Sequence, residues 1–445
     1  MRVGMDFGTT NSGIAVYDGQ TVRVLTLDEH AQTEVMRSVI YITRDHAIHI
    51  GGEAIHLYNS QNINRERRMG KRKVGRVEML FAEIGAVATD VHILVDEFEP
   101  GRLLRSLKSA LATNYSGTHL FGREYTLEDL IALFLRAARE RAEGELGEPI
   151  TAVTLGRPVH FVSAATAEDD ARAEARLRDA AHRAGFSTID FEFEPIAAAK
   201  HYALSVTTPQ TILVYDFGGG TLDLTVMRLM PGESPHVLAI GGVGIAGDRF
   251  DQRLVEGALT PHFGRDVTWG DKGLPVPRTM IDQITSWETL PALATLEMRT
   301  FLHRMQAACS APAQLYALES LIFNFYGFAL FEAVESTKRN LSEAYFAPFR
   351  FVGRDIDIWQ MITRDQFESL TRGEWRRIRA EVLETLVRAG LQPEQIQAVV
   401  RTGGSSSIPA SLALLAELFG AEKLVEEDVF TGVTAGLGIT AWERR

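Results

Sequence analysis

Hydrophobic residues occur in short runs at the start of the chain, and polar or glycine-rich turns separate these runs. Four of the runs have the length of β-strands, so we expect a β-meander at the N-terminus. They are residues 3–7, 13–17, 22–26 and 38–42. The pattern then loses its regularity up to about residue 100, and we interpret residues 60–100 as an insertion.

A helical period replaces the strand pattern after this region. Thr126-Leu-Glu-Asp129 resembles a capping box, and hydrophobic residues recur behind it at intervals of three and four. A strand at 150–155 and an alanine-rich helix from about 165 to 184 follow. The next strand, 188–193, leads into a helix that begins at Glu194-Pro195, where proline fits the first turn.

The second half of the chain repeats this order of elements. Its expected elements are strands at 211–216, 222–228 and 236–241, a helix at 247–259, a mostly helical stretch at 277–344, a strand at 397–402, a helix at 408–419 and a glycine-rich helix at about 431–443. Residues 262–276 form a second expected insertion. We therefore predict an α/β protein in which each half is a meander followed by βα units, with mixed sheets flanked by helices.

The composition is that of a globular protein with two or more domains. The 445 residues are 45% hydrophobic and carry a net charge of −12, which argues against bulk nucleic-acid binding and favours a soluble cytoplasmic protein. Cys309 is the only cysteine, so no disulfide forms within the chain. We see no signal peptide, and the most hydrophobic stretch, Leu321–Leu330, is too short to span a membrane and predicts a buried helix.

Two weaker signals have alternative interpretations. Residues 65–76 carry seven basic residues and one acid. This run indicates either a patch for nucleic acid or an acidic partner, or a solvated insertion loop, which we favour because short basic runs are common. His46, His49 and His56 fall in an expected hairpin, and their spacing is a poor match to a metal site.

The same Asp-Phe-Gly turn occurs twice. Residues 3–10 read Val-Gly-Met-Asp-Phe-Gly-Thr-Thr, and residues 213–221 read Leu-Val-Tyr-Asp-Phe-Gly-Gly-Gly-Thr. A hydrophobic run precedes and follows each turn, which predicts a β-hairpin whose turn is almost free of side chains. Asp6 and Asp216 lie 210 positions apart (216 − 6 = 210), which is the period of the duplication.

These turns have the composition of a phosphate site. Gly8 in the first turn and Gly218–Gly220 in the second let backbone N–H groups approach an anion closely. The carboxylates of Asp6, Asp216 and Asp223 can reach a phosphate-bound Mg²⁺, mostly through its waters. The chain lacks the other protein-kinase motifs and a Walker A sequence. Two such turns predict a pair of domains that close on one nucleotide.

Four other segments can complete a two-lobed nucleotide site. Lys108 is a candidate cation for the γ-phosphate or the attacking water, although a solvated surface lysine is the commoner alternative. Glu194 begins a helix, where a carboxylate also serves as a plain cap. The turn at 241–251 feeds a helix and offers backbone N–H groups to an anion. Gly403-Gly-Ser405 follows a strand and opens a helix, which suits close approach to adenosine.

The segment 335–342 places four polar residues on one helical face. Glu335, Lys338, Arg339 and Ser342 are spaced by three, four and seven positions. This face can stack Arg339 on adenine and bond ribose through Glu335 and Lys338. The alternative is a solvated helix with i,i+4 ion pairs.

With these motifs the chain resembles the nucleotide-binding domain of the seventy-kilodalton heat-shock chaperones of the DnaK type (the heat-shock protein 70 family), within the actin–sugar kinase fold group. The resemblance covers nearly the whole chain and is strongest in residues 4–12, 216–223 and 335–342. It implies a two-lobed actin-like ATPase fold of duplicated ribonuclease H-like domains, with ATP or ADP and Mg²⁺ as cofactors. The implied lobes are residues 1–207 with 426–445, and residues 208–425.

The resemblance also implies a role for each motif residue. The implied catalytic residues are Lys108, Glu194, Thr221 and Asp216; the implied nucleotide-binding residues are Gly8, Thr9, Thr10, Asn11, Gly218, Gly219, Gly220, Thr221, Gly247, Glu335, Lys338, Arg339, Ser342, Gly403, Gly404 and Ser405; and the implied metal residues are Asp6, Asp216 and Asp223. Hydrolysis at such a site is mainly positioning and charge neutralisation, so these groups suffice chemically.

The chain also departs from the family pattern. Ala246-Gly-Asp-Arg-Phe-Asp251 replaces the family's Gly-Gly-Glu-Asp-Phe-Asp, Ser407 replaces an adenine-stacking arginine, and Phe430 replaces an aspartate. We expect altered contacts to adenosine at the last two positions. The sequence reaches Arg445 without the family's linker, β-sandwich and lid, so we expect a short bacterial member with the ATPase module alone and no peptide-binding domain.

The sequence therefore predicts an ATP-binding, ATP-hydrolysing chaperone-like protein, dependent on Mg²⁺, whose lobes close on the nucleotide. A nucleotide sensor that binds without hydrolysing is the alternative. A small-molecule kinase of the same fold is disfavoured, because no motif supplies a carboxylate for a substrate hydroxyl. The expected partners are nucleotide and an unidentified protein partner or client, and neither a membrane nor nucleic acid.

Overall fold

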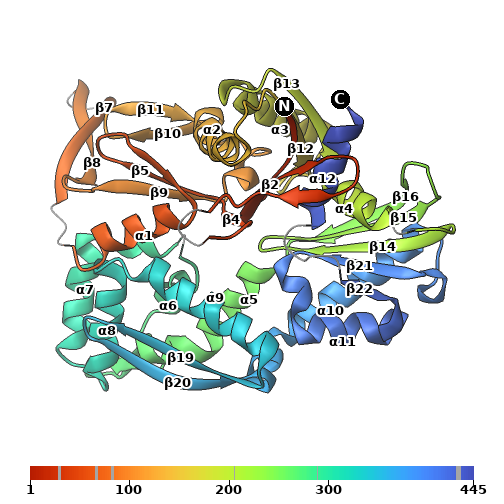
Figure 1. The fold of residues 1–445 in the computed structure, drawn as a ribbon. Coiled ribbons are helices and arrows are strands. Elements are labelled where there is room, and N and C mark those ends of the chain that lie inside the picture. Colours follow the sequence, from red (N-terminus) through yellow and green to blue (C-terminus); the bar gives the residue numbers. More distant parts are fainter. Residues whose placement is uncertain (29–31, 66–68, 82–84, 205, 288, 427–431) are drawn as a thin grey trace.

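Two mixed β-sheets form the centre of the molecule (Figure 1). The computed structural model describes residues 1–28, 32–65, 69–81, 85–204, 206–287, 289–426 and 432–445. In spatial order the first sheet contains β13 (Thr188–Phe193), β12 (Ala152–Arg157), β1 (Arg2–Phe7), β2 (Asn11–Tyr17) and β3 (Val22–Val24), with β4 (Met36–Arg37) paired to β2. The second contains β22 (Leu424–Glu426), β21 (Ala398–Thr402), β14 (Gln210–Phe217), β15 (Leu222–Leu229) and β16 (His236–Val243).

The two sheets have the same topology. β1 pairs antiparallel with β2 and parallel with β12. β14 pairs in the same two ways with β15 and β21. The predicted α/β fold with two similar halves is therefore confirmed, and we call the parts around the first and second sheets the first and second lobes.

Helices flank both sheets, and their ends follow local sequence rules. The flanking helices are α2 (Leu127–Leu146), α3 (Ala167–Arg183), α4 (Glu194–Ala203), α10 (Arg364–Arg388), α11 (Pro409–Phe419) and α12 (Gly432–Glu443). Thr126 and Asp129 bond each other's backbone N–H groups at the start of α2, so the expected capping box is confirmed. Pro195 lies in the first turn of α4, where its missing N–H leaves no bond unmade.

Helices α4 and α12 form a hydrophobic layer between the two sheets (Figure 1). Ala197 on α4 and Leu437 on α12 are fully buried there with Val214 of the second sheet. The close packing depends on glycine, because a Cβ atom at Gly436 would lie 1.7 Å from the carbonyl oxygen of Ala197. The late helix α12 thereby becomes part of the first lobe.

Each lobe carries a smaller subdomain. In the first lobe it comprises β5 (Val39–Thr43), β6 (Ile48–Ile50), α1 (Gly51–Asn62), β7 (Met69–Phe81), β8 (Gly85–Asp96), β9 (Gly101–Arg105), β10 (Gly117–Leu120) and β11 (Arg123–Thr126). In the second it comprises α5 (Gly247–Leu254), β17 (Thr268–Trp269), β18 (Leu274–Pro275), α6 (Arg278–Gln283), α7 (Leu296–Gln306), α8 (Pro312–Phe323), α9 (Gly327–Glu343), β19 (Phe346–Gly353) and β20 (Ile356–Thr363). A π-helical turn, Val255–Leu259, extends α5 to the end expected for that helix.

The structure corrects two expectations about local conformation. Most of residues 60–100 is not irregular, because β7 and β8 form a long antiparallel hairpin, and the basic run enters β7 at Met69 instead of staying in a loop. Residues 66–68 of that run lie outside the described residues, as does Phe430. The stretch Leu321–Leu330 is not one helix, because it breaks between α8 and α9.

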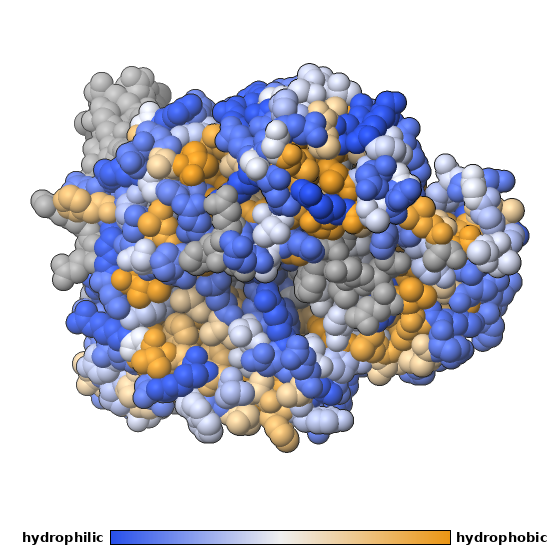
Figure 2. Space-filling view, in the orientation of Figure 1, coloured by the Kyte–Doolittle hydropathy of each residue, from blue (hydrophilic) through white to orange (hydrophobic). Residues whose placement is uncertain are grey.

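On the face shown in Figure 2, hydrophilic residues lie interspersed with hydrophobic ones. Across the described ranges, no single helix has the length and hydrophobicity needed to cross a membrane. Helices α8 and α9 are long and hydrophobic enough only when they are taken together, and a bend of 105° separates the two helices.

Candidate functional site

The two Asp-Phe-Gly segments end equivalent strands and turn toward each other. Asp6 lies opposite Gly13 in the first hairpin, and Asp216 lies opposite Asp223 in the second. Because side chains alternate along a strand, Phe7 and Phe217 point into the cores while the aspartates face the other way. The repeated sequence thus presents one carboxylate and one short turn from each lobe.

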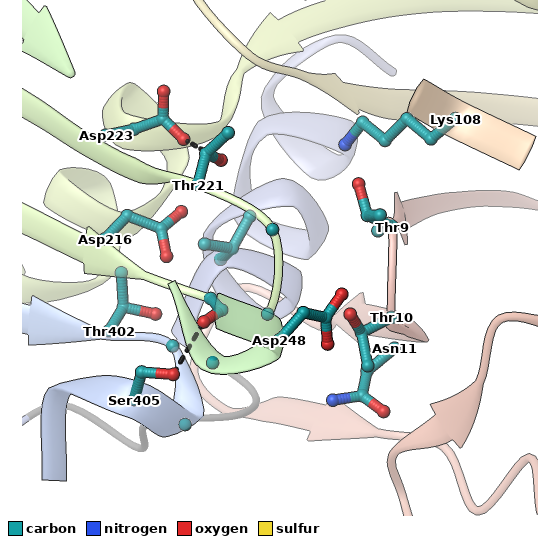
Figure 3. A pocket seen from close by; sticks show the side chains of 18 of the residues that line it. Thr9, Thr10, Asn11, Lys108, Asp216, Thr221, Asp223, Asp248, Thr402 and Ser405 are labelled. Carbon is teal, nitrogen blue, oxygen red and sulfur yellow. Dashed lines mark hydrogen bonds between the residues drawn. The ribbon is translucent and has the colours of Figure 1, made fainter. Parts of the chain in front are cut away.

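All of the predicted site residues line one cleft between the lobes. They are Asp6, Gly8, Thr9, Thr10, Asn11, Lys108, Glu194, Asp216, Gly218, Gly219, Gly220, Thr221, Asp223, Gly247, Glu335, Lys338, Arg339, Ser342, Gly403, Gly404 and Ser405. Figure 3 shows Thr9, Thr10, Asn11 and Lys108 on one side of the cleft. Asp216, Thr221, Asp223, Thr402 and Ser405 lie on the other side in the same view.

Glycine allows the two turns to approach each other closely. A Cβ atom at Gly219 would lie 2.2 Å from Thr10 Oγ1, so a larger residue there would have to displace the Thr10 side chain. Ser405 Oγ donates a hydrogen bond of 2.7 Å to the carbonyl oxygen of Gly218, which joins the turn after β21 to the second hairpin. Backbone N–H groups of both turns therefore border one narrow space that suits a phosphate chain.

Three partly buried carboxylates of the cleft have raised pKa values. Burial, with repulsion from Glu194, raises the pKa of Asp6 to about 7. Burial raises the pKa of Asp223 to about 6, and burial with repulsion from Asp223 raises the pKa of Asp216 well above its ordinary value. Such groups are stabilised as carboxylates by a cation placed among them.

Three carboxylates of the cleft offer oxygen ligands to a divalent cation. Within the part of the chain that the structure describes, no group of three or more His, Cys, Asp and Glu side chains is arranged to hold a metal ion. Asp6, Asp216 and Asp223 nevertheless line the same cleft with hard oxygen ligands. Mg²⁺ keeps several of its waters in proteins and is bound through few carboxylates, which matches this arrangement.

Lys108 lies beside the carboxylates and is not a solvated surface residue. It stands on a short 3₁₀ helix, Leu107–Ala110, and is only 7% exposed. Its ammonium forms an ion pair with Glu194 at the first turn of α4. Burial opposes its charge, but attraction to Glu194 and Asp6 raises the pKa of Lys108 above its ordinary value, so it stays a cation.

The predicted adenosine face of α9 is engaged in ion pairs. Glu335 accepts two hydrogen bonds from Arg37 of the first lobe, at 2.8 and 2.7 Å. Burial would raise the pKa of Glu335, but the bonds and charge of Arg37 hold it well below its ordinary value. Lys338 donates to Asp251 at 2.7 Å and to the carbonyl oxygen of Gly247 at 3.0 Å. Both groups proposed for ribose therefore already have protein partners.

The sequence did not reveal several other residues in and beside the cleft. Arg37 and Asp251 are the ion partners of α9, and no local motif marks such distant pairs. His160 lines the rim of the cleft, where its Nδ1 lies 2.6 Å from Asp170 Oδ2. Ser407, at the end of the helical turn after β21, is absent from the described lining of the cleft.

The comparisons with known proteins agree with one another. The family model described as "Hsp70 protein" matches residues 2–267 and 328–441. A "Chaperone protein HscA homolog" of Azoarcus sp. (strain BH72) is 28% identical over 446 residues, which covers 99% of this chain and 58% of that protein. The corresponding protein of Bordetella petrii is 29% identical, with the same coverage. A "Chaperone protein DnaK" of Thermus thermophilus is 27% identical over 94% of this chain and 57% of that protein. The chain thus spans less than three fifths of the length of these relatives.

Proposed function

The chain belongs to the Hsp70 family, and on that premise we propose that it binds Mg-ATP in the cleft and hydrolyses it to ADP and phosphate. The observation that carries this proposal is the buried ion pair of Lys108 and Glu194. A paired cation and carboxylate beside the phosphate turns can orient a water molecule for attack.

The proposal assigns a role to each of the following groups of the cleft. The two turns bind the phosphates through backbone N–H groups, and Thr221, whose hydroxyl donates to Asp223 at 2.7 Å, contacts the γ-phosphate. Glu194 accepts a hydrogen bond from the attacking water, and Lys108 offsets the charge that develops on the phosphate. Mg²⁺, held by Asp6, Asp216 and Asp223 mostly through its waters, supplies further charge neutralisation.

We also propose that the nucleotide draws the lobes together. The turns that bind its phosphates belong to different lobes, residues 1–207 with 426–445 and residues 208–425. Arg37 and Glu335 pair across the same cleft, and Thr10 meets Gly219 at its base. A ligand that bonds both turns adds to these contacts and favours the closed arrangement.

The biological role is proposed from the family. Relatives of this chain are bacterial proteins named chaperones, so we propose a cytoplasmic chaperone-like factor that uses nucleotide to regulate binding of a protein partner or client. We propose no membrane or nucleic-acid partner, in keeping with the net charge of −12.

Phosphate release with Mg-ATP tests the enzymatic proposal. Lys108→Ala and Glu194→Gln should each lower the rate of release by about 100-fold or more, because each removes a group that acts on the reacting atoms. Calorimetry should show that both variants still bind Mg-ADP. Lys200→Ala is a matched control, since Lys200 also pairs with glutamates of the first lobe but lies outside the cleft.

Other outcomes distinguish the alternatives. Absence of nucleotide binding at millimolar concentration refutes the whole proposal. Binding by the wild type without phosphate release identifies a nucleotide sensor. Transfer of phosphate to a sugar instead of water identifies a kinase of the same fold.

A further inference from the structure

A two-stranded sheet in the second lobe is hydrophobic on both of its faces. β19 and β20 pair antiparallel along their whole length, from Phe346 opposite Thr363 to Gly353 opposite Ile356. One face is buried, and β19 runs along α9. The buried residues of this face are Ala347, Phe349, Phe351, Ile356, Ile358 and Ile362.

The opposite face, which we call the hairpin face, is exposed. It consists of Phe346, Pro348, Arg350, Val352, Asp357, Trp359, Met361 and Thr363. Phe346 and Trp359 are each 62% exposed, Val352 is 58% exposed and Met361 is 48% exposed. Antiparallel sheets that keep one face in water usually alternate hydrophobic and polar residues, so a second face of this composition indicates a covering partner.

The hairpin face is large for an exposed hydrophobic patch. In Figure 2, hydrophobic residues lie beside hydrophilic ones along the lower part of the molecule, where β19 and β20 run in Figure 1. At roughly 200 Å² per aromatic residue, the exposed parts of Phe346, Trp359 and the adjoining Tyr345 amount to about 400 Å². The remaining hydrophobic and charged residues of the face bring the total to roughly 800 Å², the area that each partner contributes to a standard interface.

We propose that the hairpin face is the interface between two copies of this chain, packed face to face about a twofold axis. Arg350 and Asp357 lie together on the face and form an ion pair. A twofold axis that passes beside this ion pair would bring each Arg350 toward Asp357 of the second copy, so the face can complement itself in charge as well as in hydrophobicity. A partner with a single sign of charge would oppose one of the two residues.

The dimer leaves the nucleotide cleft accessible. None of the residues of the hairpin face belongs to the described lining of that cleft. The interface therefore depends neither on ATP binding nor on hydrolysis, and failure of one proposal does not affect the other.

Sedimentation equilibrium of the purified chain tests the interface. The wild-type chain of 49.3 kDa should sediment as a dimer at micromolar concentration. Trp359→Glu places a charge on the hydrophobic face and should raise the dimer Kd by roughly 30-fold or more. Val387→Glu is the matched control, since Val387 is a hydrophobic residue of α10 that is 71% exposed outside the hairpin face, and it should leave the Kd unchanged.

Exchanging the charges of Arg350 and Asp357 tests the twofold arrangement, and this test does not remove the large side chain of Trp359. Arg350→Asp should weaken the dimer, and the double variant Arg350→Asp with Asp357→Arg should restore it, while circular dichroism checks the fold of each variant. A wild-type chain that is monomeric at every concentration up to about 0.1 mM overturns the proposal. A dimer whose Kd neither Trp359→Glu nor Arg350→Asp changes overturns it as well.

Discussion

Three partly buried aspartates of the cleft oppose folding whenever they are charged. Burial raises the pKa of Asp6 to about 7 and that of Asp223 to about 6, and it raises the pKa of Asp216 in the same direction. In the unfolded chain these groups lose their protons near pH 4, so between about pH 4 and 7 the folded chain binds more protons than the unfolded chain. The contribution of these groups to the free energy of unfolding is therefore lost as the pH rises through that range.

Asp216→Asn removes one of these charges and should stabilise the nucleotide-free protein. We expect the free energy of unfolding to exceed that of the wild type by roughly 0.5–2 kcal/mol at pH 8, and the difference to shrink toward pH 4. Urea unfolding followed by circular dichroism at several pH values measures it. Asp282→Asn, at an exposed aspartate, is the control. A gain in stability that is the same at both pH values would contradict the explanation.

The location of these aspartates could be predicted from the repeated turn. The residues that form ion pairs with α9 could not be predicted from the sequence. Asp6 and Asp216 occupy equivalent positions in two short hairpins, which a single sequence displays directly. Glu335 pairs with Arg37 across 298 positions of the chain, and Lys338 pairs with Asp251 across 87. Spacing along a helix shows which residues share a face, but it contains no information on the charge that approaches that face from elsewhere.

At the scale of elements, prediction succeeded where the determinants are local. The capping box at Thr126 fixes the start of α2 through residues three positions apart. The break between α8 and α9 depends on distant contacts instead. Phe325 adopts a φ of 61°, which is uncommon for a large residue, and the guanidinium of Arg65 lies 4.9 Å from its ring. Tyr326 donates a hydrogen bond of 2.6 Å to Asn64 at the end of α1. Asn324 and Gly327 interrupt the hydrophobic run at this point, but they do not reveal these distant contacts.

Gly436→Ala should separate α12 from α4 and destabilise the fold. The new Cβ atom would lie 1.7 Å from a backbone oxygen of Ala197, and a backbone atom cannot move aside as a flexible side chain can. We expect a loss of about 3 kcal/mol or more in the free energy of unfolding. Gly144→Ala in α2 is the matched control, because no atom lies within 4 Å of its added methyl group, and it should stabilise the protein by up to about 1 kcal/mol. Equal changes in the free energy of unfolding for the two substitutions would show that the contact between Gly436 and Ala197 is not tight.

At the scale of the whole molecule, the duplication predicted two similar lobes but not the bonds between them. The sheets follow from patterns within each half, whereas the pair of Arg37 and Glu335 joins residues of different lobes. Both side chains are about one-fifth exposed, so water screens their attraction only in part. Removal of this pair should therefore weaken the contact between the lobes on which the proposed closure depends.

Arg37→Ala should speed release of ADP by roughly 10-fold, which corresponds to a loss of about 1.4 kcal/mol. Stopped-flow measurement with a fluorescent ADP analogue gives both rate constants, and the association rate should change little, because the binding groups of the turns remain in place. Arg379→Ala removes a more exposed arginine–glutamate pair that lies within the second lobe, and it serves as the control for loss of an arginine. If both substitutions change release equally, the effect does not come from the contact between the lobes.

Helix α12 has a consequence for the order in which the protein can fold during synthesis. It covers the first sheet, yet it begins 425 positions after β1 ends (432 − 7 = 425). At roughly 5–20 residues per second, a ribosome needs about 20–85 s to make that stretch. All strands of the second sheet are completed within this interval, so the second lobe can fold first. Until α12 is synthesised and docks, the hydrophobic surface of the first lobe stays uncovered and is exposed to proteases and to aggregation.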